Sequence, residues 1–433
     1  MGNSRALYQD IGWYGLSKFA PGLAGLAAVS LLVRALDSAQ YGSYALACTA
    51  ANASSVIASA WLAQGIHRFL PMAKEHDGVP SAVRALAKAA LAISLVVSLT
   101  AICVGAPGFG FATLVLSAIL STAQSGHTIS CAILMARFRA SAVAALEAGR
   151  SVLAVIFVLP ILVWTSYGFL PAVAALGLSY LLSFTVGAAL ARRQLNRLSI
   201  GQENEPSAKK AAMWRLARYG VPMSVWLAAF TLLPFLDRML ISLYYGRAAT
   251  GLYAAYYDFI VRGSGFFIMP VVLAVQPRAM TLFGLSRFED MRNLLKKALF
   301  ATLSTTAAIS VGTFLLGPWV TSHALGLPGD ADRLFLACLA LGGCLWQVGL
   351  LTHKVLEAEG KTTTLIISML SACGLAVGVN VLELPRLGMR AAGYALVAGS
   401  VAYALLTGVI AHRLLKFRLI GNGLIETSDR TGS

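Results

Sequence analysis

Residues 219–243, YGVPMSVWLAAFTLLPFLDRMLISL, form a continuous apolar stretch that contains two adjacent charges, Asp237 and Arg238. An α-helix rises about 1.5 Å per residue, so about 20 apolar residues cross the hydrocarbon core of a bilayer. The stretch is therefore predicted to span a membrane. Placing an acid and a base inside such a helix is costly, which makes both residues candidates for a functional role.

The composition extends this prediction to the whole chain. Of its 433 residues, 58% are hydrophobic and 12% are charged, whereas soluble domains carry about 25% charged residues. Twelve apolar runs are long enough to cross a bilayer: about 11–33, 43–66, 89–105, 109–133, 150–167, 169–190, 219–243, 252–275, 298–317, 333–356, 363–381 and 391–412. They are continuous rather than alternating, which excludes a transmembrane β-barrel. We expect an all-α polytopic membrane protein with about 12 transmembrane helices.

The basic residues predict the orientation of these helices. With the N-terminus inside, 26 of the 34 Lys and Arg residues fall to inside segments, five to outside segments and three within spans. This asymmetry follows the positive-inside rule and places both termini in the cytoplasm. Seven basic residues lie in the segment 191–218. We expect that segment to face anionic lipid headgroups, not a nucleic acid.

The segment 191–218 also divides the predicted spans into two sets of six. We expect an N-terminal six-helix lobe over 1–190, a cytoplasmic basic linker over 191–218, a C-terminal six-helix lobe over 219–412, and a cytoplasmic tail over 413–433. The lobes carry traces of a repeat, since YGSYALA (41–47) in the first matches TGLYAAY (250–256) in the second. Because each half has an even number of spans, the copies are predicted to run parallel, related by an axis along the membrane normal.

Two stretches carry a resemblance to a known family. RALDSAQYGSYALA (34–47) resembles the first loop of the polysaccharide transporter family, the Wzx-type O-antigen and exopolysaccharide flippases. RYGVPMSVWLAAFTLLPFLDRMLISLYYGRAATGLYAAYYDFI (218–260) resembles its seventh and eighth helices. The family is grouped with multidrug and toxin extrusion carriers and lipid II flippases. The resemblance implies two pseudo-symmetric six-helix lobes around a central cleft, in a bacterial inner membrane. It further implies alternating access that moves undecaprenyl-pyrophosphate-linked oligosaccharides to the outer leaflet for O-antigen, capsule or exopolysaccharide synthesis.

Polar residues inside the spans are the candidates for the substrate pathway. They are Lys18, Asn52, His127, Asp237, Arg238, Asp258 and Arg262. Lys18 could meet a pyrophosphate, or simply extend to the headgroups from its shallow depth. His127 lies in the hydroxyl-rich stretch STAQSGHTIS (121–130), and either a packed histidine or a proton carrier accounts for it. Asn52 is expected to face the cleft.

The four remaining charges are predicted to lie in the outer half of the membrane. Asp258 and Arg262 are four residues apart and share one helix face, so an ion pair between them is geometrically easy. Asp237 and Arg238 are about 100° apart around their helix, so we expect each to pair across helices. Two interpretations stay open for these charges: a static interhelical ion pair, or a gate that closes behind the cargo.

Two rival functions remain, one within transporters and one from the class of enzymes. A cation-coupled multidrug exporter would need acids in an apolar cleft, whereas the candidates here include three bases and two acids. A polysaccharide polymerase, ligase or glycosyltransferase would need a large outside loop, and the longest predicted one is about 15 residues, 318–332. We therefore expect a carrier without a catalytic or metal site; the six cysteines, all in predicted spans, have neither metal-site nor disulfide spacing.

The expected partners are the lipid-linked oligosaccharide and membrane lipids, with other polysaccharide assembly proteins as a further option and no nucleic acid. No cofactor is expected, and the sequence leaves open whether H⁺ or Na⁺ drives the cycle. No ATP-binding motif is present in the sequence.

Overall fold

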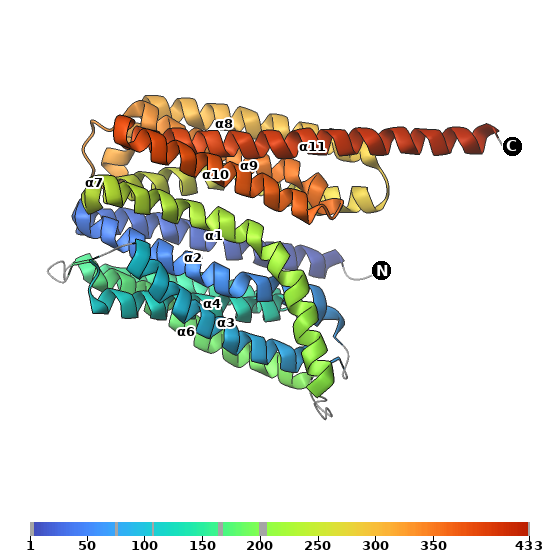
Figure 1. The fold of residues 1–433 in the computed structure, drawn as a ribbon, viewed down its shortest axis with the longest axis horizontal. Coiled ribbons are helices and arrows are strands. Elements are labelled where there is room, and N and C mark those ends of the chain that lie inside the picture. Colours follow the sequence, from blue (N-terminus) through green and yellow to red (C-terminus); the bar gives the residue numbers. More distant parts are fainter. Residues whose placement is uncertain (1–3, 74–76, 106–107, 163–167, 199–205, 432–433) are drawn as a thin grey trace. The chain divides into compact units, whose positions relative to one another are not determined.

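The computed structural model describes the backbone of residues 4–73, 77–105, 108–162, 168–198 and 206–431. It describes the side chains of residues 19, 21–73, 77–104, 108–160, 168–198, 206–272, 274–276 and 278–419. Within these ranges every regular element is a helix (Figure 1). The elements are α1 (Ser4–Ala35), α2 (Ser38–Phe69), η1 (Leu70–Met72), α3 (Val79–Gly105), α4 (Phe111–Ala136), α5 (Ala140–Val158), η2 (Leu159–Leu162), α6 (Leu170–Arg197), α7 (Pro206–Gly284), α8 (Phe288–Leu325), α9 (Arg333–Ala358), α10 (Thr362–Leu387) and α11 (Arg390–Thr431).

The helices follow the order of the twelve predicted spans. α7 is long enough for two of them, because it consists of two helices joined at Gly246, whose φ of 77° lies in the left-handed region that glycine adopts without strain. Among the described residues, nine helices are long and apolar enough to cross a membrane. α1 contributes the shorter apolar segment Pro21–Ala35. α4 has 26 residues and the hydroxyl-rich sequence noted above. The predicted all-α polytopic fold class is confirmed.

The fifth span is displaced from its predicted place. The sequence predicts it over about 150–167, but α5 already begins at Ala140. Glu147 lies before the predicted span and Arg150 at its first residue, yet both lie in the interior of this helix. Their mutual ion pair is what makes the position tolerable, with Arg150 Nη2 at 3.2 Å from Glu147 Oε2.

Other predicted boundaries also fall within helices. α6 runs to Arg197 and α7 begins at Pro206, so both ends of the predicted linker are helical, while residues 199–205 lie outside the described residues. α11 continues to Thr431 and extends beyond α9 and α10 as a single helix (Figure 1). The predicted tail over 413–433 is therefore largely a continuation of the last helix.

The chain divides into two compact units, Met1–Ala255 and Tyr256–Ser433. In the first unit, α2 packs on α3 and α4, α4 packs on α6, and α5 packs on α1 and α6. In the second unit, α9 packs on α8 and α11, and α10 packs on α11. The first unit also contains residues 206–255 of α7, because they pack against α2. The predicted lobe boundary at 191–218 stays a prediction.

Two glycine crossings attach α7 to α2. At the first crossing, a Cβ on Gly42 would lie 2.0 Å from the carbonyl oxygen of Arg247, and a Cβ on Gly251 would lie 1.8 Å from that of Ser38. Gly42 thus lies over the carbonyl of Arg247, which is four residues before Gly251. Gly251 lies over the carbonyl of Ser38, which is four residues before Gly42. This reciprocal contact has the form of a two-fold symmetric crossing. Gly42 and Gly251 are also the positions that the sequence repeat aligns.

The second crossing repeats the pattern near the other end of α2. A Cβ on Gly220 would lie 1.9 Å from the carbonyl oxygen of Trp61, and a Cβ on Gly65 would lie 3.0 Å from that of Leu216. At Gly42, Gly251 and Gly220, α2 and α7 approach so closely that an added Cβ would lie 2.0 Å or less from a carbonyl oxygen. Small residues at such positions let membrane helices approach closely.

In the second unit, ion pairs connect both ends of α9 to α11. Asp332 caps its first turn by accepting a hydrogen bond from Leu334 N at 3.0 Å, and pairs with Arg390 of α11. After its last residue, Glu359 accepts two hydrogen bonds from Arg418 of α11, at 2.8 and 2.9 Å. These bonds hold the pKa of the Glu359 carboxyl below its ordinary value. α9 and α11 are thereby fixed to each other at both ends.

Candidate functional site

The hydroxyls of the first unit form an interhelical network. Ser94 of α3 and Ser121 of α4 lie 2.6 Å apart, and Ser125 of α4 lies 2.9 Å from Ser94 and 3.1 Å from Ser55 of α2. All four side chains are buried. The hydroxyl-rich stretch 121–130 therefore faces other helices rather than lipid. Each interhelical hydrogen bond in a membrane protein contributes about 0.6 kcal/mol to stability.

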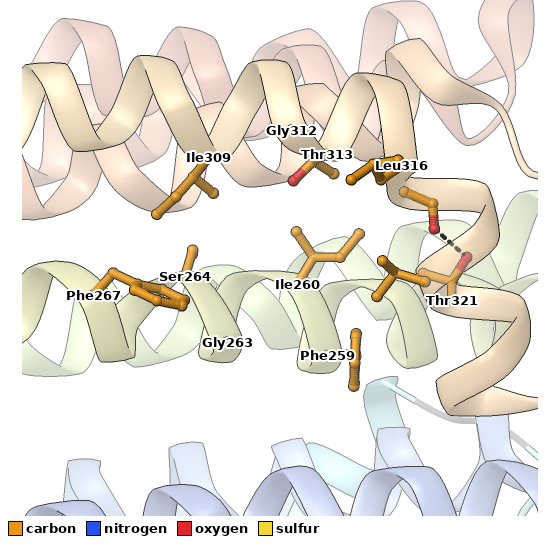
Figure 2. Close-up of a pocket in the computed structure, with 12 residues that line it drawn as sticks. Phe259, Ile260, Gly263, Ser264, Phe267, Ile309, Gly312, Thr313, Leu316 and Thr321 are labelled. Atoms are coloured by element: carbon orange, nitrogen blue, oxygen red, sulfur yellow. Dashed lines mark hydrogen bonds between the residues drawn. The ribbon is translucent and has the colours of Figure 1, made fainter.

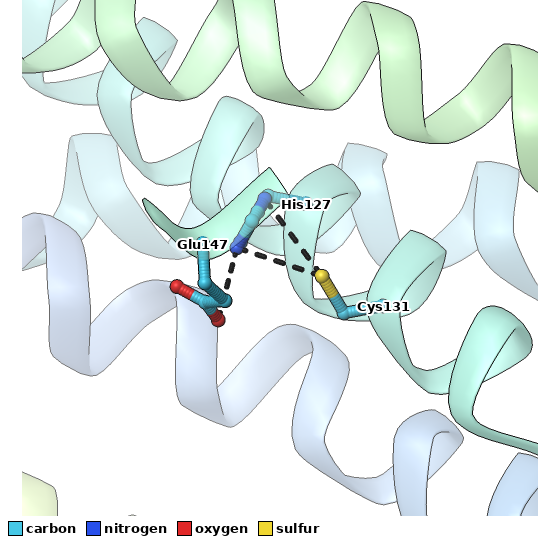
Figure 3. A group of neighbouring side chains, drawn as sticks. All are labelled: His127, Cys131 and Glu147. Atoms are coloured by element: carbon cyan, nitrogen blue, oxygen red, sulfur yellow. Dashed lines mark hydrogen bonds and ion pairs between the residues drawn. The ribbon is translucent and has the colours of Figure 1, made fainter. Parts of the chain in front are cut away.

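His127 lies one turn beyond this network, at the junction of α4, α5 and α6. Its Nδ1 is 2.9 Å from Ser183 Oγ of α6, and its Nε2 is 3.3 Å from Glu147 Oε1 of α5. The Sγ of Cys131, one turn further along α4, is 3.7 Å from Nε2. Figure 3 shows the imidazole in contact with both side chains. Sequence reasoning singled out His127 but neither of these neighbours.

Arg150 completes the cluster from α5. Its guanidinium binds the second oxygen of Glu147 and lies 4.4 Å from the ring centroid of Tyr180 on α6, a cation–π geometry. The sequence carried a signal for this pair, since Glu147 and Arg150 have the i,i+3 spacing of a helical ion pair. The signal was missed because the predicted span begins at about residue 150, so Glu147 falls before it.

Asp237 and Arg238 are among the most buried charges of the described residues, each with 2% exposure. Tyr253 donates its hydroxyl to Asp237 Oδ2 at 3.1 Å, across the kink of α7. Arg238 Nη1 donates to the carbonyl oxygen of Ala45 on α2 at 3.4 Å. Both contacts join different helical segments; the cross-helix ion pairing of these charges stays a prediction. Their role in transport stays a prediction.

Asp258 and Arg262 form an ion pair within the second half of α7, with Arg262 Nη2 at 3.2 Å from Asp258 Oδ1. The carboxylate is buried, with 8% of its side chain exposed, whereas 55% of the arginine side chain is exposed. The i,i+4 ion pair expected from their spacing is therefore present. More than half of the Arg262 side chain is therefore exposed, although its ion-pair partner is buried.

The opposite face of the same helix carries an apolar cavity of about 390 Å³ between α7 and α8. In Figure 2, Ile260 and Phe267 of α7 and Ile309 and Leu316 of α8 are among its lining side chains. At 3.6 residues per turn, Asp258 and Arg262 point about 160° away from Ile260. This helix therefore separates a charged face from a hydrocarbon-lined one.

Two further candidates are less informative. Asn52 is exposed on α2 between buried neighbours, Ala51 and Ala53. The backbone of Lys18 lies within α1, but its side chain lies outside the described residues. Assignment of both residues to a substrate pathway stays a prediction.

The second unit also contains a buried histidine that is not among the pathway residues predicted from the sequence. His353 is 6% exposed and its Nδ1 lies 2.8 Å from the hydroxyl of Tyr403 on α11. Gly349, one turn earlier, lets this tyrosine pack against α9. Its burial could not be predicted from the sequence, because the periodicity of α9 and α11 does not show that these helices pack together.

Comparisons with known proteins relate this geometry to a family and a fold. A family model described as polysaccharide biosynthesis protein matches residues 7–283. Among solved structures, lipid II flippase MurJ in an inward closed conformation superposes with a TM-score of 0.69 at 13% identity, covering 96% of this chain and 92% of that one. No curated protein gives a significant sequence match.

Two transporters of the MATE family have the same fold. An inward-facing member of the MOP superfamily gives a TM-score of 0.67 at 16% identity, covering 94% of each chain. A MATE transporter from Vibrio cholerae gives 0.63 at 12% identity, covering 96% of this chain and 98% of that one. At these identities the likeness shows the fold of the MOP superfamily transporters and nothing about cargo.

Proposed function

The chain belongs to the polysaccharide biosynthesis protein family, and from this membership we propose that it is a flippase for a lipid-linked oligosaccharide. The cargo class is an oligosaccharide repeat unit on undecaprenyl pyrophosphate, moved from the cytoplasmic to the outer leaflet for O-antigen, capsule or exopolysaccharide synthesis. Such a headgroup cannot cross hydrocarbon unaided, because burying charges and hydroxyls without partners costs several kcal/mol per group. A carrier must supply those partners along its path.

The observation that carries this proposal is that the second half of α7 has a charged face and, opposite to it, an apolar face. Its charged face has Arg262 with 55% of the side chain exposed, suited to a pyrophosphate because a guanidinium binds phosphate oxygens with paired hydrogen bonds. Its opposite face carries the apolar cavity, suited to hydrocarbon. An amphiphilic anion requires both environments within one membrane span.

Export of a cationic drug is the second candidate, and the MATE neighbours favour it by fold alone. The described acids fit this alternative poorly. Asp258 is engaged by Arg262, and Asp237 accepts the hydroxyl of Tyr253 at 2% exposure. An exposed guanidinium would repel a cation and attract a pyrophosphate.

The remaining parts of the proposal concern placement and chemistry. We place the protein in a bacterial inner membrane with both termini in the cytoplasm, as the distribution of basic residues predicts. It would act without catalysing a covalent step, with the lipid-linked oligosaccharide as its main partner. Contacts with other polysaccharide assembly proteins, and coupling to H⁺ or Na⁺, are further parts of this hypothesis.

A reconstituted flipping assay tests the function directly. Purified protein is placed in liposomes that contain a fluorescent polyprenyl-pyrophosphate oligosaccharide, and an impermeant quencher reports how much label reaches the outer leaflet. We expect faster and more complete quenching than in protein-free liposomes. A parallel set of liposomes is loaded with a lipophilic cationic dye. Dye export without lipid flipping would replace the flippase proposal by the drug-exporter alternative.

A further inference from the structure

The cluster around His127 has a geometry that the transport proposal does not use. His127 and Cys131 are one turn apart on α4, and Glu147 reaches them from α5. The ligating atoms of the three side chains all lie within 4.8 Å of one another (Figure 3). The sequence predicted no metal site, because these three residues do not form a recognisable spacing along the chain.

Hydrogen bonds define which histidine nitrogen faces the other two side chains. Ser183 Oγ donates to the carbonyl oxygen of Leu146 at 3.3 Å, so towards His127 the hydroxyl oxygen acts as an acceptor. In that arrangement the 2.9 Å contact with Nδ1 places a ring proton on Nδ1. Nε2 then faces Glu147 Oε1, 3.3 Å away, with its lone pair.

Two lone pairs at this separation repel unless a cation lies between them. A proton on Nε2 would satisfy the nitrogen and the carboxylate, and Cys131 Sγ lies 3.7 Å from the same nitrogen. A metal ion uses all three groups. With Zn–N and Zn–O near 2.1 Å and Zn–S near 2.3 Å, tetrahedral geometry separates N from O by about 3.4 Å and N from S by about 3.6 Å.

From this agreement we propose that His127, Cys131 and Glu147 form a binding site for a divalent transition-metal ion of the zinc class. The observed separations of 3.3 Å and 3.7 Å are those of two edges of a tetrahedral ligand set. The ion joins α4 to α5 within the first unit. The site does not depend on the flippase proposal and can fail or succeed independently of it.

The surroundings of the cluster match those of protein metal sites. Ligating histidines donate their other ring N–H to a fixed acceptor, and here Ser183 takes that role. Ligating carboxylates are themselves hydrogen-bonded, and Arg150 holds Glu147 Oε2 at 3.2 Å, which leaves Oε1 directed at the histidine. Metal binding releases the thiol proton, and the resulting thiolate and the carboxylate together outweigh the single guanidinium charge.

The exposure of the ligands leaves an entry for the ion. His127 and Cys131 are 4% and 7% exposed, whereas 22% of the Glu147 side chain is exposed. Three protein ligands and one accessible side are typical of sites that keep a fourth position for water or another ligand. The carboxylate side is therefore where an ion would enter and where its fourth ligand would lie.

Cobalt titration of the full-length protein tests the site. Tag-free protein in detergent is stripped with a chelator and titrated with Co²⁺, because a thiolate ligand gives cobalt a strong near-ultraviolet charge-transfer band. We expect about one Co²⁺ per chain with this band, displaced by Zn²⁺ but not by Mg²⁺, since thiolate and imidazole ligands select soft transition ions.

Matched variants separate this site from others. Cys131→Ala should abolish the band and lower the affinity by about 100-fold or more, and Ser183→Ala should lower it by about 10–100-fold. Cys338→Ala, a cysteine of the second unit, should bind as the native protein does. Replacing Cys131 removes a small side chain and preserves folding, checked by a single size-exclusion peak. Equal Co²⁺ binding by the native protein and Cys131→Ala, or none by the folded native protein, would overturn the proposal in favour of a proton.

Discussion

Asp237 has its negative charge partly satisfied by a tyrosine. With 2% exposure, the carboxylate cannot rely on water, and Tyr253 supplies a hydroxyl at 3.1 Å from the segment after Gly246. Removing one partner of a buried charge leaves that charge poorly compensated. The adjacent Arg238 meets the same demand through the carbonyl of Ala45, among its contacts. Both charges are thus part of the packing of α7, whatever they do in transport.

Replacing Tyr253 by Phe tests this contact at the scale of a single hydroxyl. We expect a loss of about 0.6–1.7 kcal/mol, the range measured for interhelical hydrogen bonds in membranes, seen as a lower thermal midpoint in detergent. Tyr244→Phe is the matched control, because the Tyr244 side chain is exposed. A Tyr253→Phe protein as stable as this control would show that the hydroxyl contributes nothing to Asp237.

Arg262 provides a residue-scale test of cargo charge. If it binds pyrophosphate, Arg262→Ala should reduce flipping by about 10–100-fold, the equivalent of a charge-assisted hydrogen bond of 1.5–3 kcal/mol. Arg262→Lys should retain part of the activity because it keeps the charge but not the planar fork. The control is Arg287→Ala, which has 60% exposure and an i,i+3 pair with Asp290. Equal activity of Arg262→Ala and this control would remove Arg262 from the pathway.

At the scale of helices, close approach between α2 and α7 depends on four glycines. The atoms that an added Cβ would meet at Gly42 and Gly251 are backbone carbonyl oxygens, which cannot rotate away as a side chain does. The helices must therefore separate if either glycine acquires a side chain. The reciprocal geometry makes the two positions equivalent parts of one contact.

Gly42→Ala and Gly251→Ala should each destabilise the protein by about 1–3 kcal/mol, the cost of overpacking a well-packed contact. Because both changes separate the same helices, the double variant should lose less than the sum of the single losses. Gly265→Ala in α7 is the control, since its Cβ would enter open space and alanine favours helix. Thermal unfolding in detergent measures all four proteins. Additive losses would mean that the glycines do not share one contact.

At the scale of the molecule, topology is the prediction with the widest consequences. Asp330 in the turn between α8 and α9 and Arg386 near the end of α10 should lie outside the cell membrane. Ser207 at the start of α7 and Ser286 between α7 and α8 should lie in the cytoplasm. All four side chains are exposed, so single cysteines at these positions can react.

Single cysteines at these four positions, in a chain whose native cysteines are replaced, should divide into two classes. Positions 330 and 386 should react with an impermeant thiol reagent in intact cells, and positions 207 and 286 only after permeabilisation. The expected result follows from the positive-inside distribution of Lys and Arg. Labelling of 207 or 286 in intact cells would invert the orientation proposed for the protein.

Hydropathy and spacing determine the features that depend on one helix at a time. The order of the twelve predicted spans was predictable because a bilayer requires about 20 apolar residues of any helix that crosses it. The Asp258–Arg262 pair was predictable because residues four apart share a helix face. The repeat was visible because Gly42 and Gly251 occupy matching positions.

Contacts between helices were decided only by the tertiary structure. Periodicity does not state which helices are neighbours, so it could not bring Glu147 of α5 to His127 of α4, or Tyr403 of α11 to His353 of α9. Hydropathy also placed the start of the fifth span at about residue 150, which leaves Glu147 outside it. Hydropathy counts each charge as a cost, whereas in the packed unit the two ions neutralise each other and belong inside α5.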